Sequence, residues 1–138
     1  MRDVLLVLLG SAVGAAGSTL GYLIVGRHEA KQRARHDCAV TLRDLVRLLT
    51  TITRPAFLTP EDNQQLDALV LDLILQGNMA GAEELKRARE IQDARDAYLQ
   101  ALTLPTAENA RDRIQQTFDR LEAMTREVFT WASRRATR

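Results

Sequence analysis

Several residue types are scarce in this chain, and each scarcity excludes a class of protein. Of the 138 residues only one is a cysteine, Cys38, so a disulfide within the chain is impossible. Only six residues are aromatic, which argues against a β-sandwich, because its strands need aromatic and β-branched side chains. The net charge is only +1, so the chain as a whole does not attract nucleic acid. The composition therefore favours an all-α fold.

Catalytic and metal-binding motifs are also missing from the sequence. It contains no P-loop, no GxGxxG and no HExxH motif, and none of its three serines lies in a nucleophile elbow. His28 and His36 lie eight positions apart, too far along a helix to hold one ion together, and no second cysteine completes a zinc site. We therefore expect no enzymatic activity, no catalytic residue, no cofactor and no metal. Arginines near the C-terminus alternate with Asp and Glu, which predicts a solvated face and no nucleic-acid partner.

The longest apolar run lies at the N-terminus. From Val4 to Gly26 no side chain is ionisable except that of Tyr22, and a bilayer core needs roughly 20 apolar residues. A cleavable signal peptide is the alternative, because the stretch SAVGAAGS offers small residues at which cleavage occurs. The apolar run continues as far as Arg27, however, and this favours a retained single transmembrane helix over residues 1–26.

Four glycines inside this run are spaced by four, three and four residues, namely Gly10, Gly14, Gly17 and Gly21. This spacing places them along one face of a helix. Small residues on a transmembrane helix let another helix backbone approach closely. The pattern predicts a packing face for another transmembrane helix, either a second copy of this chain or a different subunit.

A basic segment, residues 27–37, follows the predicted span. Arg27, Lys31 and Arg35 are spaced by four residues and form a stripe on a helix that we expect to continue out of the bilayer. The excess of basic residues after the span places that side in the cytoplasm and the N-terminus outside. Anionic lipid headgroups are the partner that this stripe predicts.

Residues 38–138 are expected to form a cytoplasmic antiparallel bundle of three to four helices. Apolar residues recur at steps of four and three from Cys38 to Ile52, which is the pattern of a helix with one buried stripe. This helix should end just before Pro55, because proline disfavours helical geometry in the residue before it.

The surface charges Glu83, Glu84 and Glu90 alternate with basic residues, which predicts an exposed face.

Capping signals divide the rest of the domain. Thr59 is a good N-cap for a helix that begins at Pro60, and we expect this helix to end at Gly77. A third helix should then run to Pro105. Thr106 should cap a fourth helix whose apolar residues recur at the heptad-like spacing of a coiled coil.

Short turns make successive helices antiparallel, so the fourth helix should return toward the membrane. It would carry Trp131, Arg134, Arg135 and Arg138 to the headgroup region, where tryptophan and arginine are favourable. Leu71 and Leu75 lie off the main apolar stripe of their helix and are candidates for a surface that binds a cytoplasmic protein.

These features predict a membrane-anchored, non-enzymatic scaffold or an accessory subunit of a membrane complex. Two alternatives stay open at this point. Self-association of the spans could build an oligomeric effector, either a pore or a signalling switch controlled by the cytoplasmic domain. The chain could also be an exported, phage-type protein that spans the envelope, although its charge distribution argues against this.

Overall fold

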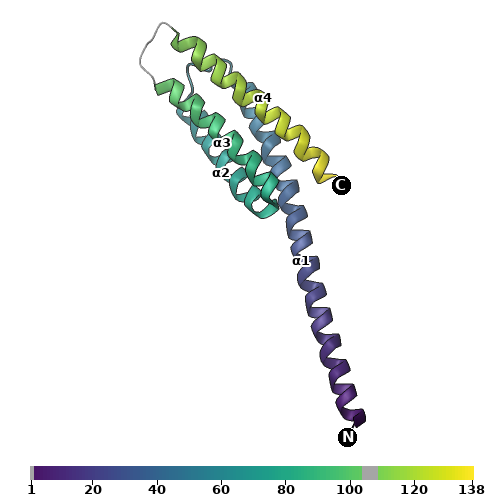
Figure 1. Ribbon diagram of the computed structural model, residues 1–138. Helices are drawn as coiled ribbons and strands as arrows, with labels where there is room; N and C mark the ends of the chain where they lie inside the picture. The colour runs from purple at the N-terminus through teal and green to yellow at the C-terminus, as the bar shows by residue number, and fades with distance from the viewer. Residues whose placement is uncertain (1, 104–108) are drawn as a thin grey trace.

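The computed structural model describes the backbone of residues 2–103 and 109–138, and the side chains of those residues from residue 23 onward. In these ranges it contains four helices and no strand, which confirms the all-α fold. The helices are α1 (Arg2–Thr51), α2 (Pro60–Ala80), α3 (Ala82–Thr103) and α4 (Ala110–Ala136). Successive helices run antiparallel as a bundle, and the N-terminal part of α1 projects beyond the other three (Figure 1).

Helix α1 is a single helix of 50 residues, or ~75 Å at 1.5 Å per residue. This helix therefore runs without a break from residue 2 through the predicted span (1–26) and the basic segment (27–37) into the bundle. Ala34 is the first described residue whose side chain is buried, and from there α1 packs against both α2 and α4.

In the part of the chain with described side chains, none of the helices offers a stretch long and apolar enough to cross a membrane. The predicted glycine face, Gly10, Gly14, Gly17 and Gly21, and most of the predicted span lie outside the residues whose side chains are described.

The core of the bundle draws one apolar stripe from each helix. The stripe predicted from Cys38 to Ile52 is buried, and Leu45 at its centre is fully inaccessible to solvent. The other helices contribute fully buried Leu66, Ile91 and Leu121. Burying a leucine or isoleucine side chain stabilises a fold by about 1.5–3 kcal/mol, so these stripes hold the four helices together.

Tyr98 of α3 joins the core to the loop after α1. Its ring packs edge-on against Phe118 of α4 with 5.3 Å between ring centroids. Its hydroxyl donates a hydrogen bond of 2.6 Å to the carbonyl oxygen of Pro55. This bond fixes the loop that connects α1 to α2 and satisfies a hydroxyl that would otherwise be buried without a partner.

The predicted start of α2 is confirmed, and its predicted end is wrong. The amide of Asp62 donates to Thr59 Oγ1 at 3.1 Å, as an N-cap requires. However, α2 passes through Gly77 and ends at Ala80. A Cβ atom on Gly77 would lie 3.1 Å from the Cα atom of Leu85, so this glycine permits close packing against α3. Gly81 makes the break, with a φ of +146° that side chains rarely allow.

The other predicted helix boundaries differ by a few residues. Helix α1 ends at Thr51, slightly before the predicted limit at Pro55. Helix α4 begins at Ala110, after Asn109, whose side chain makes no capping hydrogen bond. The predicted cap Thr106 lies outside the described residues.

Candidate anion-binding site

Charged side chains from three helices meet at the end of the bundle from which α1 projects. The junction between α2 and α3 lies at this end, and so does the C-terminus of α4 (Figure 1). Lys31 and Arg35 come from α1, Glu84 and Arg87 from α3, and Arg135 from α4. The antiparallel topology thus gathers residues that are far apart in the sequence.

Glu84 is the buried centre of this cluster, and the prediction that it lies on an exposed face is wrong. Its side chain is only 5% exposed, and Arg35 Nε donates to its Oε1 atom at 3.0 Å. Arg135 Nε lies 3.3 Å from the same oxygen. Glu84, Ala88 and Ile91 are spaced by four and three residues, so this glutamate belongs to the buried stripe of α3. A buried carboxylate needs such partners, and the two arginines supply them.

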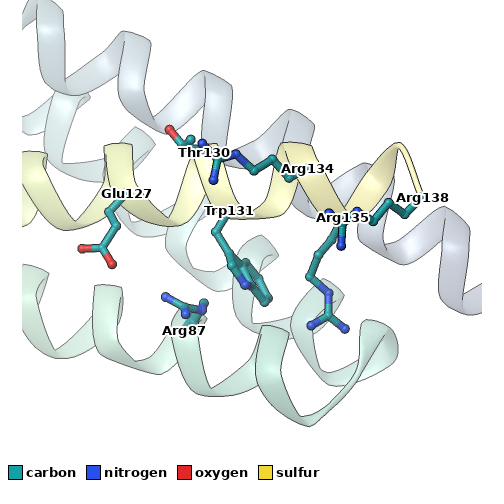
Figure 2. A pocket seen from close by; sticks show the side chains of 7 residues that line it. All are labelled: Arg87, Glu127, Thr130, Trp131, Arg134, Arg135 and Arg138. Atoms are coloured by element: carbon teal, nitrogen blue, oxygen red, sulfur yellow. The ribbon is translucent and has the colours of Figure 1, made fainter.

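Beside this cluster, a groove of about 610 Å³ lies between α3 and α4. Its lining consists of Arg87, Glu127, Thr130, Trp131, Arg134, Arg135 and Arg138. Figure 2 shows Trp131 and Arg135 pointing from α4 toward α3, with Arg87 facing the indole from α3. Most of the lining is therefore basic, with one aromatic ring at its centre.

Trp131 holds two of these arginines by cation–π contacts. The Cζ atom of Arg87 lies 4.5 Å from the ring centroid, and that of Arg135 lies 5.0 Å from it. Such contacts are worth about 0.5–2 kcal/mol each, depending on how far the cation is desolvated. Arg135 is fixed a second time by Glu84, so its guanidinium group has little freedom.

Positive charge exceeds negative charge in the groove. Among the described side chains, Arg87, Arg134 and Arg138 have no carboxylate within 4.0 Å. The Nε atom of Arg87 is buried and has no hydrogen-bond partner in the described part of the chain. Glu127 is the single acidic residue of the lining. Crowded guanidinium groups repel one another, so an anion in the groove would lower the electrostatic energy.

The arrangement suits anion binding better than covalent or metal chemistry. The described residues hold no group of three His, Cys, Asp or Glu side chains that could bind a metal ion. Burial, helped by the negative charges of Glu84 and Asp37, raises the pKa of the Cys38 thiol to about 11. This thiol therefore stays protonated near neutral pH, which makes it a poor nucleophile.

The predicted basic residues divide between several positions. Arg35 pairs with Glu84, whereas Arg134 and Arg135 line the groove. Arg27 lies on the exposed part of α1, outside the groove. Lys31 is close to the α2–α3 junction, where a Cβ atom on Gly81 would lie 3.4 Å from its Cε atom.

Local sequence patterns do not single out three residues of the candidate site, Glu84, Arg87 and Glu127. Arg87 and Trp131 lie 44 positions apart, and no local pattern links them. The spacing of Glu84 with Ala88 and Ile91 was the one available signal, because it places the glutamate on a buried stripe.

The predicted partner surface on α2 is exposed. Leu71 is 59% and Leu75 56% exposed, and Met79, four residues further, is 67% exposed. These three residues, which we call the α2 strip, follow one face of the helix.

No protein-family model, curated protein or solved structure matches the chain.

Proposed function

We propose that this protein is a single-pass, membrane-anchored helical scaffold or an accessory subunit of a membrane complex. Residues 1–26 would form the membrane anchor, with the N-terminus outside and the bundle in the cytoplasm. The observation that carries the proposal is the continuity of α1, which extends from the apolar N-terminal run into the core of the bundle.

The same continuity supports a short distance between the bundle and the bilayer. The first buried residue, Ala34, lies eight positions after Gly26, which is ~12 Å along a helix. The basic end of the bundle would then face anionic headgroups, each basic residue contributing about 1 kcal/mol near the surface. Arg27, Lys31, Arg134 and Arg135 belong to this end.

Two surfaces support the scaffold role. The glycine face of residues 10–21 would pack against another transmembrane helix, either a second copy or a different subunit. The α2 strip would be available to a cytoplasmic protein, since large apolar side chains exposed side by side mark interaction surfaces.

Membrane anchoring and its direction can be tested together. The full chain should remain in the membrane pellet after alkaline extraction. Cys38 is 3% exposed and cannot report topology, so an exposed site such as Gln64→Cys in a Cys38→Ala background is needed. In intact cells an impermeant maleimide added outside should not label this site. Labelling should appear only after the membrane is permeabilised and the reagent reaches the cytoplasm. Release into the alkaline supernatant would refute the anchor, and labelling from outside would refute the orientation.

The glycine face can be tested by crosslinking in membranes. Gly14→Leu with Gly17→Leu should abolish the crosslinked species, because leucine prevents close approach of helix backbones. Ala15→Leu with Ala16→Leu adds similar bulk on other faces of the helix and should leave crosslinking intact. Equal effects of the two pairs would contradict a specific glycine face.

A further inference from the structure

The groove between α3 and α4 carries at least two positive charges that no described carboxylate neutralises. Three guanidinium groups without a paired carboxylate, those of Arg87, Arg134 and Arg138, line the groove together with one glutamate, Glu127. A phosphate monoester carries a charge of about −1.5 to −2 at pH 7 and three strong acceptor oxygens. We propose that this groove is a binding site for a phosphate monoester.

The positions of the arginines suit a phosphate group. Guanidinium groups present pairs of donors that match phosphate oxygens, which a lysine ammonium group cannot do. Arg134 lies in the last turn of α4, Arg138 follows the end of this helix, and Arg87 lies across the groove on α3. A phosphate between the two helices would therefore receive hydrogen bonds from both sides.

The groove is larger than a phosphate group alone. Its volume of about 610 Å³ lies within the range of roughly 300–1,000 Å³ found for small-ligand sites. The indole of Trp131 forms an apolar surface in its middle. The phosphate would occupy the arginine cluster, and the organic part of the ligand would fill the rest of the groove beside the indole.

The part of the site around Trp131 is arranged before any ligand arrives. Arg87 rests on Trp131, and Arg135 is held by both Trp131 and Glu84. Ordering a long side chain costs about 0.5–1.5 kcal/mol on binding, and prior contacts reduce this cost. The Nε atom of Arg87 is buried and has no acceptor in the described part of the chain, so an anion that accepts from it would satisfy this N–H group.

Two sources could supply the phosphate monoester, a soluble metabolite or the headgroup of phosphatidic acid in a bilayer. The binding site itself does not depend on membrane anchoring, because a soluble phosphate could enter the groove of the free chain. Only the lipid source rests on the proposed function, which places this end of the bundle at the membrane surface.

The experiment uses the emission of Trp131, which is the single tryptophan of the chain and lies in the groove. The full chain, in phosphatidylcholine vesicles and separately in detergent, is titrated with glycerol 3-phosphate. A second series replaces part of the phosphatidylcholine by phosphatidic acid or by the same fraction of phosphatidylglycerol, which is a phosphodiester of lower charge.

We expect a saturable change in Trp131 emission with glycerol 3-phosphate, with phosphatidic acid, or with both. Arg134→Gln with Arg138→Gln should weaken the response about tenfold or more, because two charge-assisted contacts are lost. Both residues are exposed and make no side-chain ion pair in the described structure, so this variant should fold. The matched control, Arg111→Gln with Arg113→Gln, removes the same charge at the other end of α4 and should respond as the wild type does.

The outcomes separate the possibilities. A response to glycerol 3-phosphate identifies a soluble source, and a response confined to phosphatidic acid identifies a lipid source. The proposal is overturned if neither ligand changes the emission or if the groove variant responds like the wild type. It is also overturned if glycerol 3-phosphate has no effect and phosphatidylglycerol changes the emission as much as phosphatidic acid does. A chain that fails to insert into vesicles but still binds glycerol 3-phosphate would refute the anchor and retain the site.

Discussion

Arg35 Nε and Glu84 Oε1 lie 3.0 Å apart, although the two residues are 49 positions apart in the sequence. This pair joins α1 to the first turns of α3 at the end of the bundle from which α1 projects. Arg135 binds the same oxygen from α4, so one carboxylate connects three helices.

Replacing this carboxylate should weaken the bundle. Glu84→Gln leaves Arg35 and Arg135 without a counter-charge, and removing one partner of a buried ion pair is costly. We expect the free energy of unfolding to fall by about 2 kcal/mol, less than for a fully buried pair because Arg135 is 36% exposed. Urea unfolding followed by circular dichroism measures the change. Glu83→Gln on the exposed side of α3 is the control and should change stability by less than about 0.5 kcal/mol.

The thiol of Cys38 should be unreactive while the protein is folded. Its pKa is raised from 9.0 to about 11, first by burial and then by Glu84 and Asp37. At pH 8 the thiolate fraction should therefore be about a hundredfold lower than in the unfolded chain. Reaction with iodoacetamide, followed by mass spectrometry with and without urea, checks this. Equal rates in both conditions would show that the site is open.

The same shift makes stability depend on pH in the alkaline range. The folded state holds the Cys38 proton more tightly than the unfolded chain does, because its pKa is the higher of the two. The stabilisation is complete below about pH 9 and disappears as the pH rises through about 11. Unfolding midpoints measured across this window should fall more steeply for the wild type than for Cys38→Ala.

The hydroxyl of Tyr98 should contribute to stability separately from its ring. Tyr98→Phe keeps the edge-on contact with Phe118 and leaves the carbonyl of Pro55 without its donor. We expect a loss of about 1–2 kcal/mol in the free energy of unfolding. An unchanged urea midpoint would mean that water replaces this bond at no cost.

Gly77 and Gly26 should respond in opposite ways to alanine. A Cβ atom on Gly77 would lie 3.1–3.2 Å from backbone atoms of Glu84 and Leu85, whereas one on Gly26 meets nothing within 4 Å. Alanine gains about 1 kcal/mol of helix propensity at either site, but crowding in a packed interface costs about 1–3 kcal/mol. The melting temperature should fall for Gly77→Ala and should not fall for Gly26→Ala. A stable Gly77→Ala would show that α2 and α3 can separate slightly.

Substitutions in the α2 strip should leave stability nearly unchanged. Leu71→Ser with Leu75→Ser alters side chains that are more than half exposed, so the folded state loses little buried area. A change of less than about 1 kcal/mol in unfolding free energy is expected. Leu73→Ser, at a buried position of the same helix, is the contrasting variant and should lower stability by about 2 kcal/mol or more. Equal losses for both would mean that the strip is covered in the folded protein.

Local patterns predicted the helices, and non-local contacts account for the errors. The stripe from Cys38 to Ile52 and the cap at Thr59 depend on residues within a few positions, so the sequence predicts them well. Gly77 has the local character of a helix end, yet the proximity of Leu85 makes it an interior packing position. Glutamate is usually exposed at the surface. Glu84 can be buried because Arg35 and Arg135, from two other helices, lie within ion-pair distance of its carboxylate.

The candidate site was predicted in part. The sequence points to Trp131, Arg134, Arg135 and Arg138, because they form a basic segment with one aromatic ring. It does not point to the α3 side of the groove, because Arg87 lies in a run of mixed charges and its partner Trp131 is on another helix. A groove between two helices depends on how they pair, and that information is spread over the whole core.

Helix α1 contains no proline, and it belongs both to the projecting N-terminal segment and to the core. A tilt or a rotation about the helix axis at the N-terminus would therefore be passed to the bundle along one continuous helix. Arg35 and Cys38, at the end of the bundle from which α1 projects, would turn with it. A movement of the N-terminal part of α1 would thus reach the arginine cluster through this helix.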